Sequence, residues 1–130
     1  MEESVKPPTQ SRKVLIIEDE YFISELYVRA LEKAGYQVVL AVDGKNGLDK
    51  ALSNSFDIIL LDIMVPTITG TEILERLRSN TTQIKGKVII ITNLEQGEET
   101  KEKIEQQADG YIIKAEITPK QLVSFLDNIK

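Results

Sequence analysis

The chain has 130 residues, of which 42% are hydrophobic, and this is enough to build the buried core of one globular domain. It contains no cysteine and no histidine, which excludes disulfides, thiolate or imidazole zinc sites and Ser-His nucleophilic catalysis. Acidic residues outnumber basic ones by 21 to 16, and the resulting formal charge of -5 disfavours direct binding to nucleic acid or to an anionic membrane.

The first eleven residues, MEESVKPPTQS, lack the apolar run of a signal peptide and carry acids where a signal would carry basic residues. We predict a short disordered arm over residues 1–11 and one domain over residues 12–130. No later stretch approaches the roughly 18 consecutive apolar residues of a transmembrane helix. These features predict a cytoplasmic protein with no membrane segment.

Five short apolar runs follow the arm and are predicted to be β-strands, at residues 13–17, 36–41, 56–61, 87–91 and 111–113. Stretches with helical spacing of apolar residues separate them. The first of these contains Ile23, Leu26, Tyr27, Ala30 and Leu31, and the third contains Ile73, Leu74 and Leu77.

The expected helix starts agree with this alternation. Thr69 with Glu72, and Thr118 with Gln121, have capping-box spacing, and Pro119 falls where a first helical residue belongs. Strands that are apolar on both faces and alternate with helices predict an α/β fold, (βα)5, with a parallel five-stranded sheet. In so short a chain the flavodoxin-like, doubly wound strand order 2-1-3-4-5 is favoured.

Polar residues stand at the carboxyl ends of four predicted strands. In the order 2-1-3-4-5, Glu18, Asp19 and Asp62 converge at the switch point between the first and third strands, and Thr92 and Lys114 lie on the same rim. Taken singly, each residue also has an ordinary structural interpretation as a turn, cap or solvated side chain. Together, the clustered acids favour a hard divalent cation such as Mg²⁺, because like charges held close destabilise one another.

Four motifs carry a family resemblance: VLIIEDE, DIILLDIMVPTITG, VIIIT and ADGYIIK. In order and spacing they resemble the receiver domain of two-component response regulators, of the chemotaxis-regulator type, over residues 12–129. The resemblance implies that Asp62 is the phosphoacceptor and that Thr92 and Lys114 bind the phosphoryl oxygens. It also implies Mg²⁺ as cofactor, with a ligand set formed by Asp19, Asp62, the backbone carbonyl of Met64 and, through water, Glu18.

A domain of this family catalyses its own phosphorylation and dephosphorylation and does not turn over a free substrate. Because the chain has no histidine, the phosphohistidine donor must be another protein, a sensor histidine kinase or a histidine phosphotransfer protein. The resemblance further implies that Thr92 and Tyr111 act as a switch that re-forms the surface of helix 4, strand 5 and helix 5, for an effector protein or a homodimer partner. The segment 95–107 is predicted to shift easily, because Ile104 is its only large apolar residue. By itself, Tyr111 is also consistent with an amphipathic side chain at the sheet edge.

Two positions depart from the usual receiver pattern. Ala115 follows Lys114 where the family usually has a proline after a cis bond, and we predict a trans bond because a non-proline cis bond costs about 2.5 to 4 kcal/mol. Asn93 stands where alanine or glycine is common. It could shield the phosphate or alter phosphoryl exchange, or it could cap a helix, since Gln96 follows at capping-box spacing. Pro66 and Gly70 of the usual turn are retained.

Other functions compete with this interpretation. A haloacid-dehalogenase-like phosphatase would need a second Asp at the position of Met64, and a flavodoxin would need a Ser/Thr/Gly loop where the chain has EDEYF. The main alternative is a receiver-like protein-binding module that acts without phosphorylation. No effector domain follows the predicted fifth helix, so we expect an output through protein contact, unless the chain is part of a longer protein.

Overall fold

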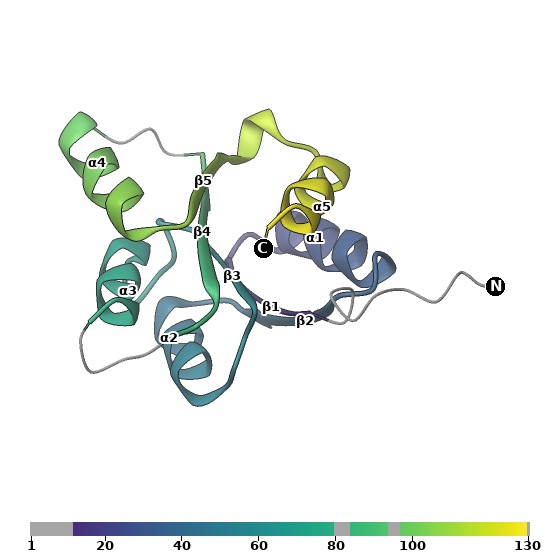
Figure 1. Cartoon of the computed structure of the whole chain (residues 1–130), viewed down its shortest axis with the longest axis horizontal. Helices are drawn as coiled ribbons and strands as arrows, with labels where there is room; N and C mark the ends of the chain where they lie inside the picture. The colour runs from purple at the N-terminus through teal and green to yellow at the C-terminus, as the bar shows by residue number, and fades with distance from the viewer. Residues whose placement is uncertain (1–11, 80–83, 94–96, 130) are drawn as a thin grey trace.

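The structure, a computed structural model, describes residues 12–79, 84–93 and 97–129. The arm predicted over residues 1–11 lies outside the described residues, as does Gln96. Strands and helices alternate along the chain (Figure 1). The strands are β1 Lys13–Ile17, β2 Gln37–Ala41, β3 Ile58–Leu61, β4 Lys87–Thr92 and β5 Gly110–Ile113. The helices are α1 Tyr21–Lys33, α2 Gly44–Ser53, α3 Gly70–Leu77, α4 Glu98–Gln107 and α5 Pro119–Asp127, with a 3-10 turn, η2, at Lys114–Glu116.

The five strands form one parallel sheet in the order β2-β1-β3-β4-β5, which confirms the predicted fold class and strand order. Helices α1 and α5 cover one face of the sheet, and α2, α3 and α4 cover the other (Figure 1). The strand register aligns the ends of the central strands, because Ile17 pairs with Leu61. The residues that follow these two, Glu18 and Asp62, are therefore neighbours at the carboxyl edge of the sheet.

Alternate residues of each strand enter two separate apolar cores, as the pleat of a strand requires. Leu15, Ile59 and Ile90 face the core under α2, α3 and α4, where Leu74 joins them. On the opposite face lies the core under α1 and α5, which contains Ile16, Leu60, Ile89, Leu31 and Leu122. Burial on both faces explains why the strands are continuous apolar runs, and it fixes the strand ends that carry the polar residues.

The helix starts follow the predicted capping signals. Thr118 accepts a hydrogen bond from the backbone N–H of Gln121, whose side chain accepts one in return from Thr118 N–H, and Pro119 is the first residue of α5. At α3, the Thr69 hydroxyl accepts from Glu72 N–H at 3.3 Å. In α1 the helical spacing holds, but Leu26 lies on the solvent side and is 54% exposed.

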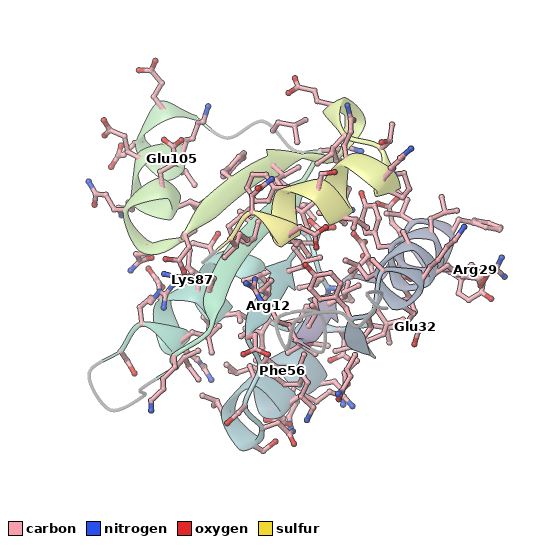
Figure 2. The ribbon with its side chains drawn as sticks, turned by 45° about the vertical axis from the view of Figure 1, so that its right-hand side comes forward. Arg12, Arg29, Glu32, Phe56, Lys87 and Glu105 are labelled. Carbon is pink, nitrogen blue, oxygen red and sulfur yellow. The ribbon has the colours of Figure 1, made fainter. Side chains whose placement is uncertain are left out.

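Helix α4 is held by few contacts. Ile104 is its one buried residue, as its composition predicts, and Figure 2 shows the side chains around Glu105 extending away from the sheet. Its C-terminal end is fixed by Arg78, which donates to the carbonyl of Gln107 at 2.8 Å and to the carboxylate of Asp109 at 2.7 Å. The buried side chain of Ile104 and the guanidinium of Arg78 therefore provide much of the attachment of α4 to the rest of the domain.

The Lys114–Ala115 peptide is trans, as predicted, since the described residues contain no cis peptide bond. Within the same ranges, none of the helices has the length and apolar character needed to cross a membrane.

Candidate functional site

The site forms where β1, β3, β4 and β5 end together at the carboxyl edge of the sheet. Glu18, Asp62, Thr92 and Lys114 are all buried there, with at most 6% of each residue exposed. Buried polar side chains are uncommon unless they are paired, so their presence at one edge marks this region as more than a set of turns.

Lys114 is the centre of the cluster. Its ammonium nitrogen lies 2.7 Å from Oδ2 of Asp62, 2.5 Å from Oε1 of Glu18 and 2.8 Å from Oε1 of Glu20. Burial by itself lowers the pKa of Lys114, but hydrogen bonds to the three carboxylates outweigh burial and raise the pKa above its ordinary value. Lys114 is therefore a permanent positive charge at neutral pH.

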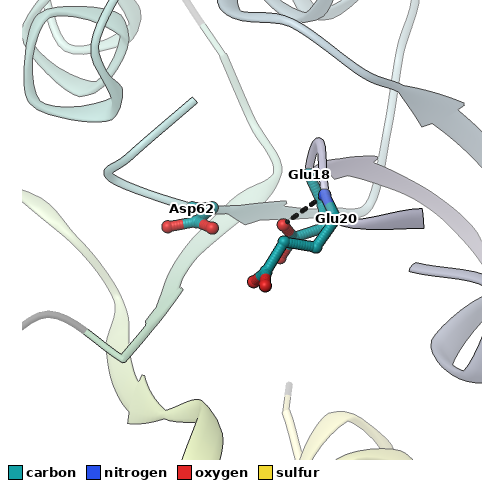
Figure 3. A group of neighbouring side chains, drawn as sticks. All are labelled: Glu18, Glu20 and Asp62. Carbon is teal, nitrogen blue, oxygen red and sulfur yellow. Dashed lines mark hydrogen bonds between the residues drawn. The ribbon is translucent and has the colours of Figure 1, made fainter. Parts of the chain in front are cut away.

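The acids outnumber that one cation. Carboxylate oxygens of Glu18, Glu20 and Asp62 lie within 4.8 Å of one another, and Figure 3 shows Asp62 at the end of β3 beside the two glutamates that follow β1. Desolvation raises the pKa of the Glu18 carboxyl to about 7, although hydrogen bonds from Lys114 and from Glu20 N–H lower it in part. Three carboxylates facing one ammonium leave an excess of negative charge that a divalent cation can neutralise.

The all-oxygen character of the cluster suits Mg²⁺, which prefers hard oxygen ligands and keeps several waters. The structure brings Glu18 and Asp62 together as predicted, but Asp19 is exposed and lies outside the group of three acids. Met64 is 60% exposed, and its N–H donates to Oδ1 of Asp62 at 3.0 Å. The metal roles predicted for Asp19 and for the Met64 carbonyl remain predictions.

Glu20 was not singled out from the sequence. Its side chain is 56% exposed and reaches back to Lys114, while its N–H donates to Oε2 of Glu18 at 3.0 Å. The one available signal was the third acid in the run Glu18, Asp19, Glu20. That signal alone does not say which acids turn toward the sheet edge.

Thr92 and Tyr111 occupy the places predicted for the switch pair. Thr92 is the last residue of β4 and is 1% exposed, and it pairs with Ile113 of β5, directly before Lys114. Tyr111 lies on β5, the edge strand, and Lys101 of α4 lies 5.7 Å from the centre of its ring. The ring of Tyr111 is thus a contact between β5 and the weakly attached helix α4.

The loop after Asp62 is tied to two neighbours. Gly44 N–H donates to the carbonyl of Pro66 at 2.8 Å, and Lys45 N–H donates to the hydroxyl of Thr67 at 2.9 Å, so the loop is fixed to the start of α2. Thr67 adopts φ 73°, a left-handed conformation that is unfavourable for a β-branched residue. At the end of the loop, Gly70 packs directly on the backbone of Asp62.

A second connection joins the loops that follow β4 and β5. The Oδ1 atom of Asn93 accepts a hydrogen bond from the N–H of Ala115 at 2.7 Å. The predicted interaction of Asn93 with Gln96 involves a residue outside the described ranges.

A parallel, doubly wound sheet with a buried aspartate, a lysine and further acids at its carboxyl edge defines a class of phosphate-handling α/β domains. The family profile of the response regulator receiver domain matches residues 14–127. The chain belongs to this family, as its motifs indicate, and it therefore has the phosphoaccepting role of a two-component receiver domain.

Curated and solved relatives agree with this assignment. The response regulator ArlR of Staphylococcus saprophyticus is 42% identical over 102 residues, which cover 78% of this chain and 45% of that protein. ArlR of Staphylococcus aureus is 37% identical over the same length. The chain thus spans about half the length of the curated relatives it matches.

Among solved structures, a CheY-like receiver domain protein of Methanospirillum hungatei has a TM-score of 0.80 at 28% identity, covering 90% of this chain and 91% of its own. Chemotaxis protein CheY4 of Vibrio cholerae has a TM-score of 0.80 at 29% identity, covering 92% of this chain and 99% of its own.

Proposed function

We propose that Asp62 accepts a phosphoryl group from a phosphohistidine on a sensor histidine kinase or a histidine phosphotransfer protein. The observation that carries the proposal is the ion pair of the buried Asp62 carboxylate with Lys114 at 2.7 Å, at the edge of the sheet where acids converge. The donor histidine belongs to another protein, because this chain has none.

The transfer needs little covalent chemistry from the protein. One carboxylate oxygen of Asp62 attacks phosphorus, the P–N bond of the phosphohistidine breaks as the O–P bond forms, and the donor's imidazole leaves with the electron pair of the broken bond and takes up a proton. Lys114 neutralises negative charge on the phosphoryl oxygens, and Thr92 offers them its hydroxyl. The fixed positions of these groups supply the catalysis, since phosphoryl transfer depends on orientation and electrostatics.

We further propose Mg²⁺ as the cofactor, held by Asp62 and Asp19 with the Met64 carbonyl, and by Glu18 through water. When bound, Mg²⁺ neutralises the charge that accumulates on the phosphoryl oxygens. Glu20 lies in the same acidic group and adds negative charge to it. Calorimetric titration of Mg²⁺ tests the ligand set: Asp19→Asn should weaken binding more than Glu18→Gln, and equal losses would contradict the proposed roles. A loss in Glu20→Gln as large as that in Asp19→Asn would assign Glu20 to the ligand set instead.

The acceptor is tested by incubation with acetyl phosphate and Mg²⁺, followed by intact mass measurement. We expect one Mg²⁺-dependent phosphate addition per chain, abolished in Asp62→Ala. Asp57→Ala is the matched control, because Asp57 precedes β3 and lies at the opposite end of the strand, where it accepts from Lys13 N–H. An adduct that persists in Asp62→Ala would contradict the assignment. Complete lack of an adduct on the wild-type chain would favour the binding module that acts without phosphorylation.

Phosphorylation is proposed to change the face formed by α4, β5 and α5, and so to regulate an effector protein or a homodimer. The single buried residue of α4 and the contact between Lys101 and Tyr111 support this face as the part that can move. On this face lies a groove of about 500 Å³, and its lining combines apolar residues such as Tyr111 and Phe125 with polar residues such as Gln121 and Asn128. The groove offers both apolar surface and hydrogen-bonding groups to a protein partner.

Hydrogen exchange with beryllofluoride, an aspartyl-phosphate mimic, and Mg²⁺ tests the switch. Protection should change around residues 92–114, while α1 changes little. Thr92→Ala should still accept phosphate on Asp62 but lose the change in α4 and β5. Changes restricted to the loops after β1 and β3 would contradict the switch.

A further inference from the structure

The two positions at which the sequence departs from the receiver pattern contact each other. Asn93 follows β4 and Ala115 follows Lys114, and Oδ1 of Asn93 accepts the hydrogen bond of Ala115 N–H at 2.7 Å. The strand pairing places these loops side by side, because Thr92 pairs with Ile113. The hydrogen bond therefore joins the ends of two neighbouring strands immediately beyond the buried part of the site.

The backbone directly beyond Lys114 is exposed to solvent. Ala115 and Glu116 are exposed, so burial contributes little to holding the η2 turn in which they lie. At the end of the turn, Ile117 N–H donates to the Lys114 carbonyl at a long 3.3 Å. Yet the Lys114 ammonium meets its carboxylates at 2.5 to 2.8 Å. A backbone that is held in place at Lys114 reduces the conformational freedom that this long side chain must lose to keep these contacts.

The chemistry of the contact is specific at both positions. A proline at position 115 would have no N–H to donate, and an alanine or glycine at position 93 would have no side-chain oxygen to accept. The trans Lys114–Ala115 peptide and the Asn93 side chain are thus complementary: the first presents the donor and the second supplies the acceptor.

We propose that Asn93 is a positioning residue for Lys114, and that it acts by holding the Ala115 peptide. Asn93 does not need to touch the phosphoryl group for this role. The consequence for phosphoryl transfer rests on the function proposed above for Lys114, but the positioning itself is a property of the protein without phosphate.

A double-mutant cycle on the full chain tests the proposal, with Asn93→Ala, Ala115→Pro and the double variant. NMR without phosphodonor follows the Ala115 amide exchange rate and the side-chain Cε and Nζ signals of Lys114. A hydrogen bond typically changes an equilibrium by roughly two- to tenfold, so Asn93→Ala should raise the Ala115 exchange rate by about that factor and shift the Lys114 signals. In the Ala115→Pro background, the same change at Asn93 should leave the Lys114 signals where they are.

Asn93→Asp is the matched control, since it keeps an acceptor oxygen at the same place, and its Ala115 exchange rate should stay within about twofold of wild type. If Ala115→Pro does not fold, the comparison of Asn93→Ala with Asn93→Asp decides the question. Unchanged Ala115 exchange in Asn93→Ala, or equal shifts of the Lys114 signals in both backgrounds, would overturn the proposal.

Phosphorylation rates measured on the same variants distinguish a failure of the proposed phosphoacceptor function from a failure of the proposed positioning of Lys114 by Asn93. We expect Asn93→Ala to slow adduct formation from acetyl phosphate by about two- to tenfold when Ala115 is present and not in the Ala115→Pro background. If the wild-type chain takes up no phosphate, the proposed function fails, and the NMR cycle still decides whether Asn93 positions Lys114.

Discussion

Replacing Gly70 by alanine should damage both stability and the phosphoacceptor. Gly70 is the first residue of α3, and a Cβ placed on it would lie 2.5 Å from the carbonyl oxygen of Asp62 and 2.5 Å from the Cα of Ile63. Ordinary contacts between such atoms are about 3.5 Å, so the helix or the backbone after β3 must move by about 1 Å. Neither can move freely, because Asp62 N–H donates to Ile17 in the sheet and Gly70 N–H donates to Ile63.

The expected change in the free energy of unfolding of Gly70→Ala is the difference between two opposing effects. Overpacking of this kind costs about 1–3 kcal/mol, while replacing glycine by alanine in a helix gains up to about 1 kcal/mol. We expect Gly70→Ala to lower the free energy of unfolding by about 2 kcal/mol, since both atoms that it meets belong to the backbone. Gly97→Ala is the matched control, because a Cβ on Gly97 would meet nothing within 4 Å, and it should change stability by less than about 1 kcal/mol.

Urea denaturation followed by circular dichroism gives the two free energies of unfolding. Intact mass after timed incubation with acetyl phosphate shows whether the displaced Asp62 backbone also slows phosphorylation, which we expect for Gly70→Ala and not for Gly97→Ala. Equal losses of stability in the two variants would refute the packing argument. A destabilised Gly70→Ala protein that accepts phosphate at the wild-type rate would show that the movement is absorbed by α3 and not by the acceptor.

Two further predictions concern the loop and the helix that adjoin the site. Thr67→Val should lower the free energy of unfolding, measured by urea denaturation, more than Thr67→Gly does. Both variants lose the hydrogen bond from Lys45 N–H, but only glycine removes the strain of the left-handed backbone, which is about 1–2 kcal/mol. The opposite order would show that Thr67 carries no strain. Arg78→Ala should speed hydrogen exchange in α4, since Arg78 fixes its end beside Asp109, whereas Arg76→Ala, which removes an exposed i,i+4 pair, should not. Similar exchange rates in both variants would show that Arg78 does not contribute to holding α4, and that the buried Ile104 does.

The sequence was sufficient for the fold because the strongest signals are local and agree with one another. Apolar runs predict every strand to within two residues at either end, and the capping residues Thr69 and Thr118 mark two helix starts. Parallel order then brings Glu18, Asp62, Thr92 and Lys114 to one edge without knowledge of any contact. All four are buried in the structure, and their roles at the site remain predictions.

What the sequence did not predict depends on side-chain direction and on contacts between loops. Glu20, and not Asp19, turns toward Lys114, a choice set by the backbone between β1 and α1. The left-handed Thr67 carries no glycine or asparagine signal. The bond between Asn93 and Ala115 joins residues 22 positions apart, and neither has a local pattern that points to the other.

The ion cluster around Lys114 forms only when the five-stranded sheet is complete. Lys114 is 94 residues from Glu20 and 52 from Asp62, and at least two strands of the sheet lie between the partners of each contact. Contacts of such long sequence separation form only when the intervening chain is ordered, because loop closure must come first. During synthesis, a nascent chain that has emerged only through β4 has the acids of this cluster but not Lys114, so the ion cluster forms only after β5 has emerged.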